Sequence, residues 1–232
     1  METILTTHAL SKRYGGIAAL DNVTLSLPAG KVVGLLGPNG SGKTTFIKLA
    51  AGLLTPTSGV VLVDGNAIGT KTKAIVSYLP ERSYLADWMR VSQCLDYFQD
   101  FYADFDRSRA NDMLQRLGVD QNARMKTLSK GTQEKVQLVL VMSRKAKLYL
   151  LDEPIGGVDP ATRDYILNTI IGNYDEGATV LISTHLIHDV EKVLDEFIFL
   201  KEGRIVMHDC TDNVRETEGR SLDELFREVF RC

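Results

Sequence analysis

Short runs of apolar residues recur along the chain and predict strands that are buried on both faces. Every residue at 32–36, 148–151 and 197–200 is aliphatic, aromatic or glycine, and 179–183 carries three aliphatic residues in a row. Such runs are typical of parallel sheets, because helices cover both faces of those sheets. Further short strands are predicted at 59–65, 75–80 and 204–208.

Residues 3–30 show a different pattern, in which apolar and polar residues alternate. Val23, Leu25 and Leu27, for example, are separated by single polar residues. Alternation is typical of antiparallel strands with one covered face. The segment closes at Pro28-Ala29-Gly30, so an N-terminal antiparallel β subdomain is predicted before the first buried strand.

From about residue 81 to residue 147 the apolar residues take helical spacing. This region predicts a helical insertion at about 82–147, with helices at 92–103, 107–117 and 132–145. A shorter helix is predicted at 43–51, before Gly52. A terminal amphipathic helix at 221–230 places on one face Leu222, Leu225, Phe226 and Val229. The order of elements predicts an α/β fold whose mainly parallel sheet is interrupted by the insertion.

Composition narrows the class of protein. The chain has 232 residues with a net charge of −3, so no overall field attracts it to nucleic acid, and no nucleic-acid partner is predicted. Its three widely spaced cysteines suit a reducing cytosol and exclude a disulfide framework. We expect no signal peptide, and no apolar run reaches the roughly 18 residues of a spanning helix. Work at a membrane would therefore need a separate membrane partner.

Residues 37–44 carry the strongest chemical signal. They read Gly37-Pro38-Asn39-Gly40-Ser41-Gly42-Lys43-Thr44, between a predicted strand and a predicted helix. Glycines let backbone N–H groups converge, and the helix N-terminus adds partial positive charge. Lys43 can reach the β- and γ-phosphates of a nucleotide, and the Thr44 hydroxyl can ligate Mg²⁺. The segment predicts a P-loop NTPase core, and the alternative of a plain glycine-rich turn does not explain the complete match.

Two acids follow the apolar run at 148–151. This strand would deliver Asp152 and Glu153 to its C-terminal end, where ligands bind in open α/β sheets. Asp152 would hold Mg²⁺, directly or through water, and Glu153 would polarise the attacking water. The alternative is a pair of solvated acids that only end a strand.

Three further segments complete a pattern of motifs. They are Leu128-Ser129-Lys130-Gly131-Thr132, Gly156-Gly157-Val158-Asp159-Pro160, and Thr184-His185 at the end of the next strand. With Tyr14 near the start, the order of motifs resembles the nucleotide-binding subunit of an ATP-binding cassette (ABC) transporter. The resemblance covers about residues 3–210, which we expect to form the ATPase domain, followed by a short helical tail at 211–232.

The resemblance implies roles for individual residues. Tyr14 would stack on adenine, although a buried tyrosine at a strand end is the alternative. The residues expected to bind ATP are Tyr14, Gly37, Pro38, Asn39, Gly40, Ser41, Gly42, Lys43, Thr44, Thr45, Ser129, Gly131 and Asp159. Lys43, Glu153 and His185 are expected to act in catalysis, and Thr44, Asp152 and Glu81 to lie at Mg²⁺. In the family, the segment of Ser129 and Gly131 binds nucleotide held by the partner subunit.

Three residues depart from the family pattern. Lys130 replaces a glycine and Thr132 a glutamine in the signature, and Glu81 stands where glutamine is usual. A glutamate supplies a charged oxygen and no donor, which alters the expected Mg²⁺ shell. Glu81 pointing to solvent remains the alternative.

The resemblance implies a motor that binds ATP and Mg²⁺, dimerises with itself or another ATPase subunit, and drives a separate transmembrane permease. It would lie in the cytoplasm, peripheral to the inner face of the cell membrane. The short tail resembles export-type prokaryotic subunits. Soluble ABC ATPases of DNA repair or translation are the alternative class, but the first carry long coiled coils and the second two cassettes.

Overall fold

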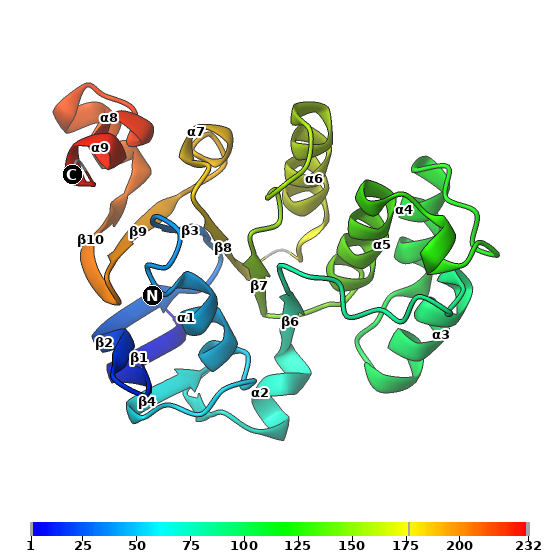
Figure 1. The fold of residues 1–232 in the computed structure, drawn as a ribbon, viewed down its shortest axis with the longest axis horizontal. Coiled ribbons are helices and arrows are strands. Elements are labelled where there is room, and N and C mark those ends of the chain that lie inside the picture. Colours follow the sequence, from blue (N-terminus) through cyan, green and yellow to red (C-terminus); the bar gives the residue numbers. More distant parts are fainter. Residues whose placement is uncertain (1, 176, 231–232) are drawn as a thin grey trace.

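The computed structural model describes residues 2–175 and 177–230 (Figure 1). Within these residues the strands form two sheets, a six-stranded one that is mainly parallel and a four-stranded antiparallel one. The larger sheet contains, in spatial order, β10 (Arg204–Cys210), β9 (Glu196–Lys201), β3 (Val32–Leu36), β8 (Thr179–Thr184), β7 (Leu148–Asp152) and β6 (Val76–Leu79). Among these described strands, β10 alone runs antiparallel to its neighbour. The predicted parallel sheet is confirmed.

Burial on both faces explains the continuous apolar sequences of the central strands. All residues of β3 and β7 are buried. Along β7, Tyr149 and Leu151 join the hydrophobic core on one face, whereas Leu148 and Leu150 join the core on the other. Because parallel strands end at the same edge, the residues that follow β3, β7 and β8 meet there.

The antiparallel sheet confirms the predicted N-terminal β subdomain. Its strands are, in spatial order, β2 (Ile17–Pro28), β1 (Thr3–Tyr14), β4 (Ser58–Val63) and β5 (Asn66–Ala67). Helix α1 (Lys43–Ala50) lies beside this sheet in Figure 1. Phe46 and Ile47 of α1 share a hydrophobic core with Leu5 of β1 and Leu181 of β8, so α1 is packed between the two sheets. This packing fixes the segment that opens α1.

The helical insertion leaves the larger sheet after β6 and returns to it at β7. It contains α3 (Val91–Phe101), α4 (Arg107–Arg116), the short 3₁₀ helix η1 (Met125–Thr127) and α5 (Lys130–Met142). The three predicted helices are confirmed, and their ends agree with the prediction to within three residues. Helix α2 (Thr70–Ile75) was not predicted, because six residues are too few for the helical spacing of apolar residues to repeat. Ile75 therefore ends a helix instead of opening a strand.

Arg144 joins this insertion to the larger sheet. Its side chain is 3% exposed, and its guanidinium donates to both carboxylate oxygens of Asp104 at 3.0 Å. It also donates to the carbonyls of Ala74 and Val76 at 2.9 and 2.6 Å, and lies 3.9 Å from the ring centroid of Tyr102. One buried side chain at the end of the insertion thus binds both Asp104 within the insertion and the backbone where β6 begins.

Four helices complete the described chain, namely α6 (Pro160–Asn173), α7 (Ile187–Val190), α8 (Thr211–Glu218) and α9 (Leu222–Val229). The predicted apolar face of α9 is confirmed, since Leu222 and Leu225 are buried and the Phe226 ring packs on that of Phe199. Cys232, in the predicted tail, lies outside the described residues. Across residues 2–175 and 177–230, no helix combines the length and the apolar character needed to cross a membrane.

Candidate active site

The loop between β3 and α1 is held in a compact form by close backbone contacts. A Cβ atom at Gly37 would lie 2.4 Å from the Leu200 carbonyl, and one at Gly42 would lie 2.4 Å from the Ala19 carbonyl. Gly42 also has a φ of 108°, which a residue with a side chain rarely adopts. The Ser41 hydroxyl is buried and has no hydrogen-bond partner. The loop therefore offers unused donors beside the N-terminus of α1, where an anion is stabilised.

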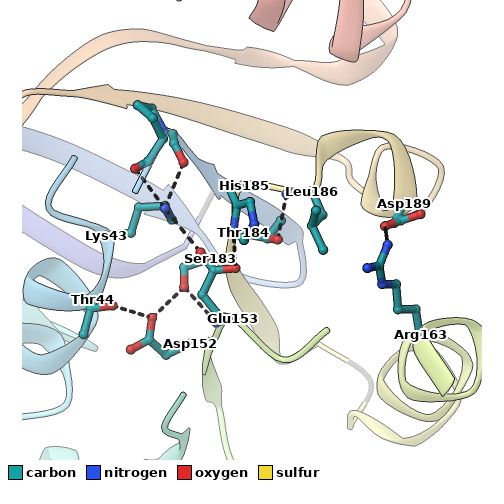
Figure 2. Close-up of polar contacts among 12 residues, drawn as sticks. Lys43, Thr44, Asp152, Glu153, Arg163, Ser183, Thr184, His185, Leu186 and Asp189 are labelled. Carbon is teal, nitrogen blue, oxygen red and sulfur yellow. Dashed lines mark hydrogen bonds and ion pairs between the residues drawn. The ribbon is translucent and has the colours of Figure 1, made fainter. Parts of the chain in front are cut away.

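Lys43 places a buried cation inside this loop. Its side chain is 5% exposed, and Nζ donates to the carbonyls of Gly37 at 2.8 Å and Pro38 at 3.2 Å. The same nitrogen lies 3.3 Å from Oε1 of Glu153 (Figure 2). An anionic ligand in the loop would replace these partners, because a phosphate oxygen binds an ammonium group more strongly than a neutral carbonyl does.

Asp152 ends β7 under the same loop. Its Oδ1 accepts hydrogen bonds from the hydroxyls of Thr44 at 3.0 Å and Ser183 at 2.7 Å (Figure 2). Its Oδ2 is buried and has no partner. Burial is the main cause that raises the pKa of Asp152, and the nearby charges of Glu81 and Glu153 act in the same direction. A cation at this point would remove the cost of a buried, half-satisfied carboxylate.

The side-chain oxygens at this point fit Mg²⁺. The unpartnered Oδ2 of Asp152 and the hydroxyl of Thr44 are the hard oxygen ligands that Mg²⁺ prefers, and Mg²⁺ usually takes its remaining ligands from phosphates and water. In the described part of the chain, no three acidic, histidine or cysteine side chains gather as a metal cluster. Glu81 is exposed and lines the cleft close enough for its charge to act on Asp152.

Glu153 holds a conformation that turns its carboxylate into the site. Its φ is 50°, in the left-handed region, and its N–H donates to the Ser183 carbonyl at 3.0 Å. Oε1 contacts Lys43, and Oε2 lies 3.1 Å from Nδ1 of His185 (Figure 2). Strained backbone of this kind is concentrated at functional sites. The fold thus brings together Lys43, Thr44, Asp152, Glu153 and His185 from three separate parts of the sequence.

A cleft of about 900 Å³ opens over these residues. Its lining includes the phosphate-loop residues Asn39, Gly40, Gly42, Lys43, Thr44 and Thr45. Glu81, Glu153 and His185 line it as well, together with Lys130 and Glu134 of α5. The cleft is therefore large enough for a nucleotide and carries both cationic and acidic groups on its walls.

Other predicted binding residues lie outside this cleft. Ser129 caps the N-terminus of α5, where its hydroxyl accepts from the N–H of Thr132 at 3.2 Å, and Gly131 follows in the first turn. Asp159 caps α6 in the same way, and its two hydrogen bonds from Thr162 lower its pKa. Ser129, Gly131 and Asp159 do not line the cleft of their own chain, whereas Lys130, between the first two, does.

Tyr14 is also outside the cleft. Its side chain is 49% exposed at the end of β1, and the Lys12 ammonium lies 5.3 Å from its ring centroid. The predicted alternative of a buried tyrosine is therefore wrong. An exposed ring face remains open to a flat, uncharged ligand.

Several residues at the site were not predicted to act there. Ser183 holds Asp152, but a serine at a strand end gives no distinctive sequence signal. Arg163 of α6 donates to the Val158 carbonyl at 3.2 Å and pairs with Asp189 of α7 at 2.8 Å (Figure 2). Arg163 thereby ties the loop after Glu153 to the segment after His185.

Comparison with known proteins agrees with this geometry. The sequence profile of a family described as "ABC transporter" matches residues 20–156. The chain is 32% identical to the ABC transporter ATP-binding protein YtrB of Bacillus subtilis (strain 168), over 96% of this chain and 73% of that protein. It is 28% identical to the daunorubicin resistance ATP-binding protein DrrA3 of Streptomyces coeruleorubidus, over 98% and 75% respectively. A solved ATP-binding subunit of an ABC transporter superposes with a TM-score of 0.87, at 30% identity over 99% of this chain and 100% of that one.

Proposed function

The chain belongs to the ABC transporter family as an ATP-binding, ATP-hydrolysing subunit, and from this premise we propose that the cleft binds MgATP and powers export through a separate permease. The observation that supports this most directly is the convergence of Lys43, Asp152 and Glu153. Lys43 and Glu153 line the cleft, and the buried Asp152 is linked to it through its hydrogen bond with Thr44. Each of the three supplies a different part of phosphoryl-transfer chemistry, namely phosphate binding, metal binding and water activation.

Lys43 and the loop act first, on the triphosphate. The ammonium exchanges its carbonyl partners and Glu153 for β- and γ-phosphate oxygens, while loop N–H groups bind the same anion. Thr44 and Asp152 would hold Mg²⁺, and Glu81 would lie near it. When bound, Mg²⁺ neutralises charge that develops on the phosphates.

Glu153 then acts on water. Once Lys43 has turned to phosphate, the carboxylate of Glu153 is free to accept the proton of an attacking water. His185 holds the other carboxylate oxygen at 3.1 Å, so it orients the base and can also reach the γ-phosphate. Water activation thus follows nucleotide binding in this order.

Two subunits would enclose the nucleotides. Ser129, Gly131 and Asp159 lie outside the cleft of their own chain, at the N-terminal ends of α5 and α6. These helix ends suit an anion held by a second subunit. The dimer would contain two copies of this chain or this chain with another ATPase subunit. Tyr14 would stack on the adenine.

ATP-binding subunits of this family pair with membrane permease components, and the helical insertion is the surface proposed for this contact. It exposes large apolar side chains, including Trp88 at 67% and Phe101 at 68%. Such exposure favours a protein partner. The subunit would then lie in the cytoplasm, at the inner face of the membrane. Likeness to a daunorubicin resistance protein supports export over import.

A soluble ABC ATPase of DNA repair is less well supported. The insertion between β6 and β7 is built from short helices, of which α5 is the longest at 13 residues. A long coiled coil would need sustained heptads that these helices do not have. The transport-coupled function is therefore favoured.

Substitution of Lys43 by alanine tests the proposal. We expect Lys43→Ala to lose tight MgATP binding and ATP hydrolysis, because it removes the buried cation of the loop. Lys48→Ala is the matched control, since Lys48 is on the same helix but does not line the cleft. Titration with a fluorescent ATP analogue compares the three proteins. Equal affinities for wild type and Lys43→Ala would overturn the assignment of the cleft.

A further inference from the structure

Tyr78 lies on β6, one strand away from Asp152. The two parallel strands pair so that Tyr78 stands opposite Leu150, and Leu150 precedes Asp152 by two residues. Side chains two residues apart share a face of the sheet, and partners in register share it too. Tyr78 and Asp152 therefore project from the same face, toward the side on which α1 begins.

Two buried polar atoms on this face have no partner. They are the hydroxyl oxygen of Tyr78 and Oδ2 of Asp152, and neither is hydrogen-bonded to the other. Proteins rarely leave such atoms unsatisfied, and an orphan usually marks a bound water, ion or ligand. Two orphans in one region, a donor and an acceptor, are what a single bound water requires.

The charges around Tyr78 agree with this placement. Burial raises the pKa of its hydroxyl, and the carboxylates of Asp152 and Glu81 raise it further. The phenol therefore keeps its proton at physiological pH, and this proton is available to a bound acceptor. Its ring packs against the hydrophobic core that holds α1, which gives the hydroxyl a fixed position.

We propose that Tyr78 is a positioning residue of the magnesium site, whose hydroxyl donates, through a water that enters together with Mg²⁺, to Oδ2 of Asp152 and fixes that carboxylate. The proposal rests on the function proposed above. It adds a residue that touches neither the triphosphate nor the reacting water. Thr44 and Ser183 both donate to Oδ1 of Asp152, and the water held by Tyr78 would fix the second oxygen, Oδ2.

Substitution of Tyr78 by phenylalanine removes one oxygen and keeps the ring. In the nucleotide-free protein this deletes an unsatisfied hydroxyl, so the melting temperature should stay the same or rise. With ATP present, the Mg²⁺ concentration that gives half of the thermal stabilisation should rise about tenfold, because a hydrogen bond to a charged group is lost.

Tyr149 supplies the matched control. Its hydroxyl is buried as well, but it is satisfied by the carbonyl of Arg144. Tyr149→Phe should therefore lower the melting temperature of the nucleotide-free protein and leave the Mg²⁺ dependence unchanged. Without nucleotide, Tyr149→Phe should lower the melting temperature and Tyr78→Phe should not. With ATP, only Tyr78→Phe should raise the Mg²⁺ midpoint.

The measurement is a thermal-shift titration with Mg²⁺ at fixed ATP, supported by binding of a fluorescent ATP analogue. An unchanged Mg²⁺ midpoint in Tyr78→Phe would overturn the proposal, as would a loss of stability without nucleotide. If wild type responds to MgATP while Tyr78→Phe behaves identically, the positioning role alone fails. If wild type gives no response to MgATP, the proposed function fails and Tyr78 loses its role with it.

Discussion

Substitution of Glu153 by glutamine should separate ATP binding from ATP hydrolysis. The amide keeps the shape of the side chain but cannot accept a proton from water at neutral pH. Loss of a positioned general base lowers turnover by about 100- to 10,000-fold, equivalent to about 3–5 kcal/mol in the barrier. We therefore expect kcat to fall by at least about 100-fold.

The affinity of Glu153→Gln for ATP, in contrast to its kcat, should increase. In the nucleotide-free protein, Lys43 lies 3.3 Å from the Glu153 carboxylate, and the two side chains are only 5% and 11% exposed. A contact between charged groups of this kind contributes about 1.5 kcal/mol or more, and ATP must displace it. Glu153→Gln removes this competition, so ATP should bind up to about tenfold more tightly.

Glu196→Gln is a suitable control. Glu196 also pairs with a histidine, since its Oε2 lies 3.0 Å from Nε2 of His208, but this pair is at the β9–β10 edge of the sheet and outside the cleft. The control should bind and hydrolyse ATP as wild type does. Phosphate release measures kcat, and calorimetry measures the dissociation constant. Normal turnover in Glu153→Gln would assign the base to another residue, and weaker binding would refute the competition between Glu153 and ATP for Lys43.

Three further substitutions test other parts of the site. Glu81→Gln should improve ATP affinity more in EDTA than in Mg²⁺, because the Glu81 charge acts on Asp152 and repels an anion when no cation is present; an identical change in both buffers would place Glu81 outside the site. Ser129→Arg should abolish ATP-dependent dimers in light scattering and leave nucleotide binding by the monomer intact, apart from about 1 kcal/mol of stability lost with the α5 cap; loss of monomer binding would show that Ser129 acts within its own chain. Burial raises the pKa of Glu134, so its charge costs stability at neutral pH, and this cost disappears as the pH falls through the raised pKa. Glu134→Gln should therefore raise the melting temperature more at pH 7.5 than at pH 5; a gain that is constant with pH would contradict this.

Local patterns in the sequence were enough to predict most of the fold. The apolar runs predicted β3 and β7 because burial on both faces leaves a continuous signal in a few residues. The phosphate loop was equally clear, since its glycines, Lys43 and Thr44 are consecutive. Helix α2 was missed because a six-residue helix contains less than two turns. The length of a segment therefore limited what its pattern could predict.

The parts of the site that were missed depend on register between strands. Ser183 reaches Asp152 because β8 pairs with β7 so that these two residues stand opposite each other. Tyr78 lies on the same face of the sheet as Asp152 because of the register of β6 on β7. No local pattern encodes such a pairing, since it is set by how whole strands align in the folded sheet. Residues that act through their neighbours become visible only in the structure.

The hydrogen bonds of Arg144 have a consequence for which parts of this protein can change in evolution. Arg144 binds Ala74 and Val76 before the insertion and Asp104 within it, while β6 and β7 pair directly beside it. The pairing of β6 with β7 and the Arg144 bonds to Ala74 and Val76 thus depend on no residue of the outer helices α3 and α4. The entropy of closing a loop grows slowly, by about 0.6 kcal/mol for each doubling of its length. The outer helices could therefore gain, lose or exchange residues to suit a new membrane partner, while the register that places Asp152 stays the same.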